Sequence, residues 1–246
     1  MIPIGDDSHP GRGFPVVNLA IIAINLAVFI LIQLPSEAFT MAFSAIPAEI
    51  LGGRDLVGPT PIRLPDGIVE TIVHERGPSP IQLTLLTSIF MHGGWAHLLG
   101  NMLFLYVFGD NVEAAFGPAR YLAFYLVTGV LASLAHVFTN ADSVIPSLGA
   151  SGAISGVLAG YLVFFPSNRV RVLVLMRLVP FTYTVPAVVM IGMWALFQFI
   201  NGFASITPTE ETSGVAWFAH IGGFAAGLLL ALLAKPFVHA ERRFAW

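Results

Sequence analysis

Six segments of this 246-residue chain are apolar and long enough, or nearly long enough, to cross a lipid bilayer. A transmembrane helix needs about 20 mostly apolar residues, and we place the segments at 14–34, 94–110, 120–139, 150–166, 179–202 and 215–235. Only 10% of the residues are charged, against about 25% in an average soluble domain. The sequence therefore predicts an all-α, polytopic membrane protein in which six helices form a single domain over residues 1–246.

The loops between these segments differ in positive charge. An even number of spans places both termini on one side, and an excess of Lys and Arg marks the cytoplasmic side. Three cations lie on the far side of the predicted bundle, at Arg54, Arg63 and Arg76. Eight lie on the side of the termini: Arg12, Arg120, Arg169, Arg171, Arg177, Lys235, Arg242 and Arg243. We therefore expect both termini to be cytoplasmic. The lack of a targeting extension favours a prokaryotic cytoplasmic (inner) membrane.

The connection between the first two spans, about residues 35 to 82, is the longest in the chain. It holds seven of the 17 prolines, which exclude a further buried membrane span there. Two β-favouring runs flank Pro65–Gly67, so residues 61–75 predict a hairpin on the outer face. A loop of this length is usually functional, although filling space above a bundle of short helices is an equally good explanation.

Polar side chains stand near the start of three of the predicted spans. His92, His97 and Asn101 open the second span, Ser151 opens the fourth, and His220 lies near the start of the sixth. Polar groups within a membrane are costly, and they usually face the interior of a bundle or a water-filled cavity. Because these three spans all run from outside to inside, their first turns lie at a similar depth. We expect the five side chains to meet below the outer surface.

Small residues recur every four positions in two of these spans. They are Gly152 and Gly156 in the fourth span and Gly223 and Gly227 in the sixth. Such a spacing lets two helices approach closely. His220 is three and seven residues before the two glycines of its own span, so it shares their face. Packing explains the glycines with or without a site, but it also brings His220 toward Ser151.

These residue types favour acyl transfer. A serine hydroxyl is a weak nucleophile until a neighbouring base takes its proton, and His220 can serve as that base for Ser151. No Asp or Glu lies within a span at this depth, so the sequence indicates a dyad. His97 and Asn101 are four residues apart on one helix face, and together with the Ser151 N–H they can donate to an oxyanion.

Several other kinds of chemistry are excluded by the residues that are missing. The chain has no cysteine, which excludes a thiolate nucleophile. His92 and His97 are five residues apart and lack the His-Glu-x-x-His pattern of zinc proteases, so we expect no metal and no cofactor. A formal net charge of −3 and the lack of a basic patch argue against nucleic acid as a partner.

With these motifs in this order, the sequence resembles the rhomboid intramembrane serine proteases. The resemblance extends from residue 82 to residue 227. Its most specific parts are Met91–Met102, Phe108–Glu113, Gly149–Gly152 and Ala219–Gly227. It implies a six-helix rhomboid bundle with a long external loop between helices 1 and 2, a serine endopeptidase activity, and single-span membrane proteins as substrates within the lipid bilayer.

The resemblance also implies roles for individual residues. Ser151 would be the nucleophile and His220 the general base, and His97 and Asn101 would form the oxyanion hole with the Ser151 amide. A substrate helix would enter laterally between spans two and five. A rhomboid relative that has lost its activity and binds or escorts membrane clients is the alternative. A transporter is disfavoured because inverted repeats and charges at mid-bilayer are not evident.

Two further features concern the surroundings of this site. Span five carries bulky aromatic residues, Trp194 and Phe197 among them, which would form either the substrate gate or a lipid-facing surface. Many rhomboid proteases have a tyrosine four residues after the nucleophile, beneath the histidine. This chain has Ser155 there, so the sequence leaves the support of His220 unidentified.

Overall fold

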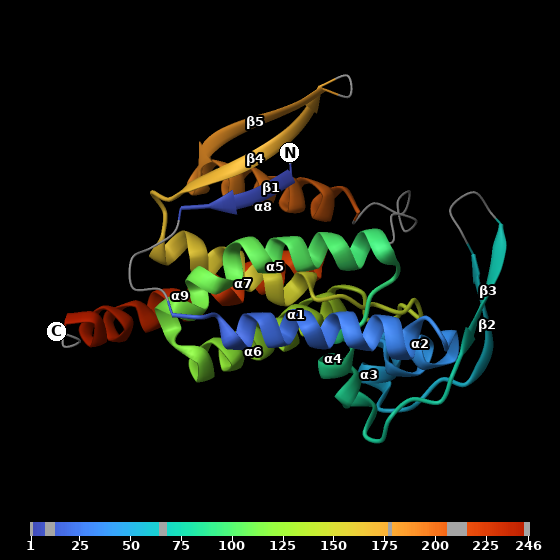
Figure 1. Cartoon of the computed structure of the whole chain (residues 1–246). Coiled ribbons are helices and arrows are strands. Elements are labelled where there is room, and N and C mark those ends of the chain that lie inside the picture. Colours follow the sequence, from blue (N-terminus) through green and yellow to red (C-terminus); the bar gives the residue numbers. More distant parts are fainter. Residues whose placement is uncertain (1, 8–12, 64–67, 177–178, 206–215, 244–246) are drawn as a thin grey trace.

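The structure, a computed structural model, describes residues 2–7, 13–63, 68–176, 179–205 and 216–243. Arg12, Arg177, the predicted hairpin turn at Pro65–Gly67 and the first residue of the sixth predicted span lie outside this range. The chain is mostly helical (Figure 1). Its main helices are α1 (Val16–Val28), which continues as a π-helical turn (Phe29–Gln33), α5 (Trp95–Phe116), α6 (Pro118–Thr139), α7 (Ser151–Phe164), α8 (Ala187–Ala204) and α9 (Trp217–Arg243).

Four helices in the described part of the chain are long and apolar enough to cross a membrane. They are Val16–Gln33, Pro118–Thr139, Ala187–Ala204 and Trp217–Val238. The other two predicted spans form helices as well, but α5 carries the buried Asp110 and Glu113, and α7 has only 14 residues. The protein is thus an integral membrane protein, while the full count of six spans stays a prediction.

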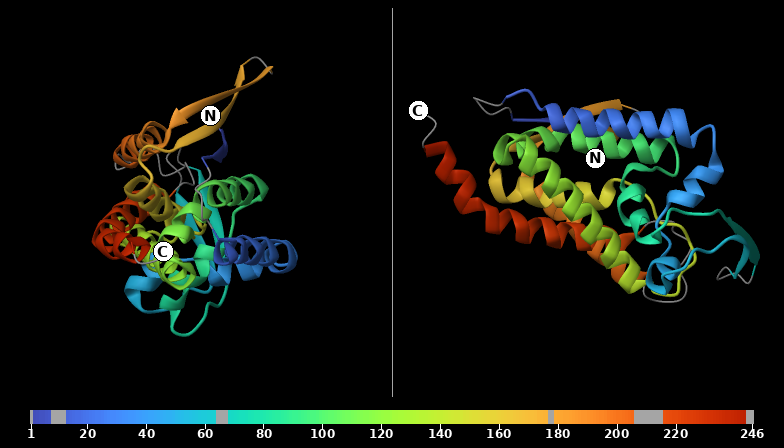
Figure 2. Two further views of the ribbon diagram at one scale, coloured as in Figure 1. Left: turned by 60° about the vertical axis from the view of Figure 1, so that its left-hand side comes forward. Right: turned by 90° about the horizontal axis from the view of Figure 1, so that it is seen from below.

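Helix α7 forms the centre of the molecule. Every residue from Gly152 to Tyr161 is buried, and α5, α6 and α9 pack around it (Figure 2). A helix that is apolar on all sides is a core element, and α7 is surrounded by protein rather than by solvent. This position explains how a helix shorter than its neighbours remains in the bundle.

The all-α prediction is incomplete, because two small sheets accompany the helices. Strands β1 (Ile2–Asp6), β4 (Arg169–Met176) and β5 (Val179–Pro186) form an antiparallel sheet in the order β1-β4-β5. The predicted start of span five at residue 179 is therefore wrong. Residues 179–186 are apolar, but they alternate Val, Phe, Tyr and Thr, which favour strands, and the helix begins only after Pro186.

The segment from residue 35 to 90 is more structured than a loop. It contains the short helices α2 (Glu37–Phe43), α3 (Pro47–Gly52) and α4 (Thr84–Thr87), with 3-10 turns at Ile81–Leu83 and Ser88–Phe90. The predicted hairpin is confirmed as β2 (Gly58–Arg63) paired with β3 (Val69–His74). It stands away from the helices in Figure 1. Its location on the outer face of a membrane remains a prediction.

A buried carboxylate fixes the position of α5 relative to α1. The Glu113 side chain accepts hydrogen bonds from the backbone N–H groups of Val17 (3.1 Å) and Asn18 (2.7 Å). The first N–H groups of a helix lack intrahelical partners, and a negative charge there is favourable. The Asn18 side chain in turn donates to the Leu105 carbonyl and accepts from the Tyr121 hydroxyl. This network joins α1, α5 and α6, and α5 also carries His97 and Asn101.

Candidate active site

The structure brings Ser151 and His220 into contact. Ser151 is the first residue of α7, and His220 lies in the first turn of α9. The serine Oγ is 2.8 Å from His220 Nε2, which is hydrogen-bond distance. The other ring nitrogen, Nδ1, is 2.7 Å from the side-chain oxygen of Gln198 on α8. Three helices therefore supply one continuous line of hydrogen bonds.

The glycines of α7 and α9 make this contact possible. A Cβ atom built on Gly223 would lie 2.1 Å from the Gly152 carbonyl oxygen. A Cβ atom on Gly227 would lie 2.4 Å from the Gly156 Cα atom. No other residue has a small enough side chain to permit such distances, so the two backbones touch at both positions. The close crossing holds the first turns of α7 and α9 side by side.

The turn before Ser151 brings His97 to the site. Gly149 has a φ of +134°, a conformation that side chains strongly disfavour. A Cβ atom there would also lie 2.8 Å from His97 Nε2, so the imidazole rests directly against this turn. His97 Nδ1 accepts a hydrogen bond from the Gly93 N–H. Since a neutral imidazole has one donor and one acceptor, the Nε2 that lies against the Gly149 turn carries the hydrogen.

Asn101 lies one turn beyond His97 on α5 and is 9% exposed. Its side-chain nitrogen has no hydrogen-bond partner among the described residues. A buried donor without a partner costs about 1–3 kcal/mol. Such a group is a suitable donor for an oxygen atom that a substrate would bring.

His92, which the sequence grouped with these residues, lies apart from the hydrogen-bonded line. It is in the turn before α5, it is 2% exposed, and its ring is edge-on to the His97 ring at a centroid distance of 5.2 Å. The Gln33 side chain holds its backbone, accepting from the His92 N–H at 2.9 Å. Burial and the nearby His97 lower the pKa of the His92 imidazole to about 3. His92 is thus a neutral packing group behind His97.

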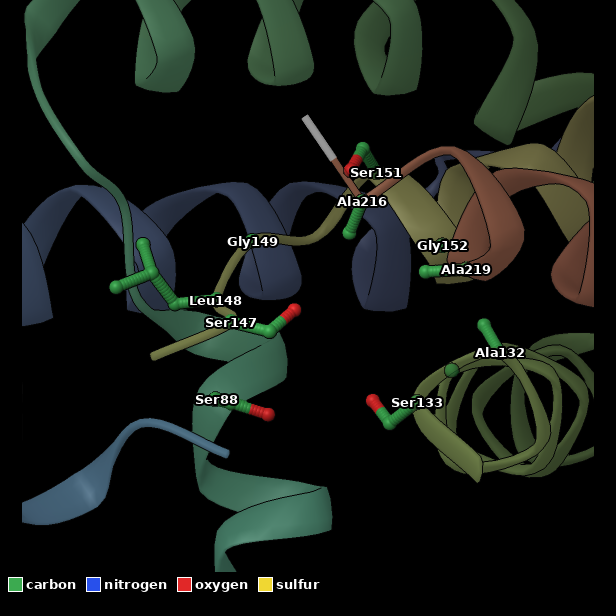
Figure 3. A pocket seen from close by; sticks show the side chains of 11 residues that line it. Ser88, Ala132, Ser133, Ser147, Leu148, Gly149, Ser151, Gly152, Ala216 and Ala219 are labelled. Atoms are coloured by element: carbon green, nitrogen blue, oxygen red, sulfur yellow. The ribbon is translucent and has the colours of Figure 1, made fainter. Parts of the chain in front are cut away.

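A small polar cavity adjoins Ser151. Its volume is about 20 Å³, which is enough for one water molecule. The hydroxyl groups of Ser88, Ser133 and Ser147 point into the same space, and Gly149 and Ser151 form its upper wall (Figure 3). Polar groups on several sides are what a buried water needs. The cavity therefore has room for one water molecule next to the serine.

The two predicted gate residues lie in different environments. Trp194 is partly buried, and its ring is 6.1 Å from the His220 ring and 6.2 Å from the Phe224 ring, both measured between centroids. Phe197 is 57% exposed on the outer face of α8 and contacts Trp217 at its edge. Trp194 thus packs against the site, and Phe197 is the more accessible of the two.

The sequence interpretation does not include Gln198 among the candidate site residues. Ser155 does not take the place of the expected tyrosine, because its hydroxyl donates to the Ser151 carbonyl at 2.6 Å. His220 is instead contacted by Gln198 and by the rings of Trp194 and Trp217. Comparing the membrane depth of polar residues across all the spans would identify Gln198. Depth is compared only for the spans expected to begin at the outer side, whereas the span that contains Gln198 is expected to end there.

Comparisons with known proteins agree with this architecture. The family model described as Rhomboid domain matches residues 81–237. RHOMBOID-like protein 5 of Arabidopsis thaliana is 30% identical over 202 residues, which cover 80% of this chain and 56% of the relative. Rhomboid protease GluP of Bacillus subtilis is 37% identical over 148 residues, 60% of this chain and 25% of the relative. Rhomboid protein 1, mitochondrial, of Saccharomyces cerevisiae is 27% identical over 171 residues, 66% of this chain and 44% of the relative.

The chain therefore spans between a quarter and just over half of the length of these relatives. The matched region contains α5 to α8 and most of α9, and so it contains each residue that lines the candidate site. The chain belongs to the rhomboid family.

Proposed function

We propose that this protein is an intramembrane serine protease that cleaves transmembrane segments of single-span membrane proteins near the outer face of the bilayer. The contact of 2.8 Å between Ser151 Oγ and His220 Nε2 is the observation that carries the proposal. A rhomboid relative whose name includes "protease" supports it, since GluP is 37% identical over the aligned region.

In the proposed reaction, His220 accepts the hydroxyl proton while Ser151 Oγ attacks the peptide carbonyl carbon. The developing oxyanion receives hydrogen bonds from the Ser151 backbone N–H, His97 Nε2–H and the Asn101 amide. His220 then returns the proton to the leaving amine, and an acyl-enzyme remains. A water molecule, activated by the same imidazole, hydrolyses the ester and restores the serine. The serine-lined cavity is a suitable source of that water.

The substrate must unwind before it can react. In an intact helix each carbonyl accepts a hydrogen bond from within the helix and is surrounded by side chains. A serine on the rim of a bundle cannot reach such a carbonyl. We therefore expect single-span proteins with small or helix-breaking residues near the outer interface to be cut, and we expect them to reach the site laterally between α5 and α8.

The membrane itself is less narrowly defined than the site. The relatives come from a plant, from yeast mitochondria and from a bacterium, so they do not favour the prokaryotic cytoplasmic membrane over others. From the sequence, we also propose that both termini are cytoplasmic and that the whole chain forms a single domain.

Cleavage of a reporter tests the proposal. The purified protein is reconstituted in liposomes with a single-span substrate and treated in parallel with a serine-directed fluorophosphonate. We expect cleavage and covalent labelling, both abolished in Ser151→Ala. Ser44→Ala is the matched control, because the Ser44 hydroxyl donates to the Thr40 carbonyl and does not line the cavity beside Ser151. Labelling or cleavage by Ser151→Ala would refute the assignment. A folded wild-type protein that retains clients but neither cleaves nor labels would favour the client-binding alternative.

A further inference from the structure

We propose that Gln198 is the positioning residue of His220: its side-chain oxygen accepts the Nδ1 proton and so selects the imidazole tautomer whose bare Nε2 faces Ser151. The proposal deepens the proposed protease function and rests on it. Its basis is the pair of contacts on the two ring nitrogens, 2.7 Å to Gln198 Oε1 and 2.8 Å to Ser151 Oγ.

The direction of the protons follows from the chemistry of the three groups. A side-chain amide oxygen can only accept a hydrogen bond, so Nδ1 of His220 carries the hydrogen. A neutral imidazole then has an unprotonated Nε2. The Ser151 hydroxyl is left to donate to Nε2, which is the arrangement that a general base requires. With the opposite tautomer, Nε2–H would point at the serine oxygen and His220 could not take its proton.

The contact is also enforced by burial. Gln198 is 5% exposed, and it lies on the side of α8 that packs against α9. Leaving a buried amide oxygen and a buried ring N–H without partners would cost about 1–3 kcal/mol for each group. The Gln198 rotamer that meets His220 is therefore strongly favoured over one that turns away.

The other groups around His220 do not perform this task. The rings of Trp194 and Trp217 limit the tilt of the imidazole, with centroids at 6.1 and 6.2 Å. An indole nitrogen is a donor only, so it cannot accept the Nδ1 proton. The other titratable side chains near His220 are His97 on α5 and His136 on α6. Neither of these is a hydrogen-bond partner of Nδ1 in the structure.

The location of Gln198 on α8 gives the contact a second consequence. The opposite face of α8 is open, with Met193, Leu196 and Ile200 more than half exposed. If α8 moves away from α9 to admit a substrate, Gln198 leaves Nδ1 and the base loses its fixed tautomer. His220 regains the tautomer with an unprotonated Nε2 only when α8 has returned to α9. The position of α8 and the ability of His220 to act as a base are therefore linked.

The test compares Gln198→Met with Gln198→Glu in the full-length protein. Methionine has a similar shape but no strong acceptor, whereas glutamate keeps the acceptor and adds a negative charge. Asn201→Ala is the matched control, since Asn201 is three residues further along α8 and bonds to the Phe197 carbonyl. Melting in detergent establishes that each variant is folded.

We expect Gln198→Met to lower kcat by about tenfold to a hundredfold with little change in KM. Gln198→Glu should keep activity at high pH and move the acidic limb of the kcat/KM profile to higher pH, because a carboxylate beside Nδ1 favours the protonated ring. Asn201→Ala should match the wild type in both measurements. A wild-type rate and pH profile in Gln198→Met, or an unmoved acidic limb in Gln198→Glu, would overturn the proposal.

A spectroscopic measurement separates this proposal from the proposed function. The ¹⁵N chemical shifts of the histidine rings report which nitrogen carries the hydrogen, and a His220→Gln sample assigns the signal. We expect the Nδ1–H form in the wild type and a mixture in Gln198→Met. A wild-type His220 with the hydrogen on Nε2 would refute the role of Gln198. The expected tautomer in a protein that cleaves nothing would instead count against the protease function and leave the positioning role standing.

Discussion

Replacing Gly227 by alanine should separate α7 from α9 and disable the site from a distance. A Cβ atom at this position would be 2.4 Å from Gly156 Cα and 2.5 Å from its carbonyl oxygen. Non-bonded carbon atoms rest at about 3.5–4.0 Å, so α9 must move outward by about 1 Å. Both obstructing atoms belong to the backbone and cannot rotate away. Overpacking of this kind costs about 1–3 kcal/mol.

The same displacement reaches the candidate dyad. Gly227 is seven residues from His220, about 10 Å along the helix, and a rigid helix carries the shift over that length. The Oγ–Nε2 distance of 2.8 Å would grow to about 3.8 Å, beyond the range of a hydrogen bond. A misplacement of about 1 Å in a catalytic group can lower the rate about a hundredfold.

The assay combines melting in detergent with the rate of fluorophosphonate labelling. Gly192→Ala on α8 is the matched control, because a Cβ atom there meets nothing within 4 Å. Both substitutions add the same methyl group to a helix and gain about the same helix propensity. We expect a lower Tm and slower labelling for Gly227→Ala only. If Gly227→Ala labels and melts as the wild type does, the close crossing of α7 and α9 does not hold the site together.

Three further predictions concern stability and access. Burial raises the pKa of the Glu49 carboxyl group. The stability that this side chain contributes is therefore fully present below pH 4.5 and is lost as the pH rises. Glu49→Gln should raise Tm at pH 7 but not at pH 4. The pKa of His92 is lowered, so the protein should lose stability as the pH falls below about 6.5. Relative to His92→Leu, the loss should be about 1 kcal/mol between pH 6.5 and 5.5, measured by denaturation in detergent. The double substitution Gly202→Cys and Trp217→Cys would place two Cβ atoms 3.5 Å apart. The two cysteines should form a disulfide that links α8 to α9. Within this variant, oxidation should slow cleavage of the membrane substrate and dithiothreitol should restore it, while the rate of fluorophosphonate labelling should be the same in both states.

The arrangement around Ser151 and His220 could be predicted because several independent signals in the sequence agree. Depth, helix direction and the four-residue spacing of glycines each place the two side chains at the same level on helices that touch. The glycine spacing depends only on positions within one helix, and depth and direction need only the order of the spans along the chain. The contact of 2.8 Å follows from their combination.

The features that were missed depend on distant parts of the chain. Hydropathy sums apolar residues without regard to their period, so hydropathy predicts that Val179–Pro186 is the start of a span. Its strand character becomes evident only once it pairs with β4, which pairs in turn with β1. The Asp6 carboxylate, which accepts hydrogen bonds from Asn111 and Tyr161, joins residues more than 100 positions apart. No periodicity within the first six residues indicates such partners.

The short length of α7 connects the fold to the proposed chemistry. Fourteen residues rise about 21 Å, whereas the hydrocarbon core of a bilayer is about 30 Å thick. A helix in contact with lipid could not be this short without exposing polar backbone groups at its ends, but α7 is enclosed by α5, α6 and α9. If its far end is level with one surface, Ser151 at its first residue lies about 9 Å below the other. Polar residues such as Ser151 are therefore expected at that depth. A hydrolytic site inside a membrane needs a helix short enough to place the nucleophile below the surface, and it needs polar side chains that retain water.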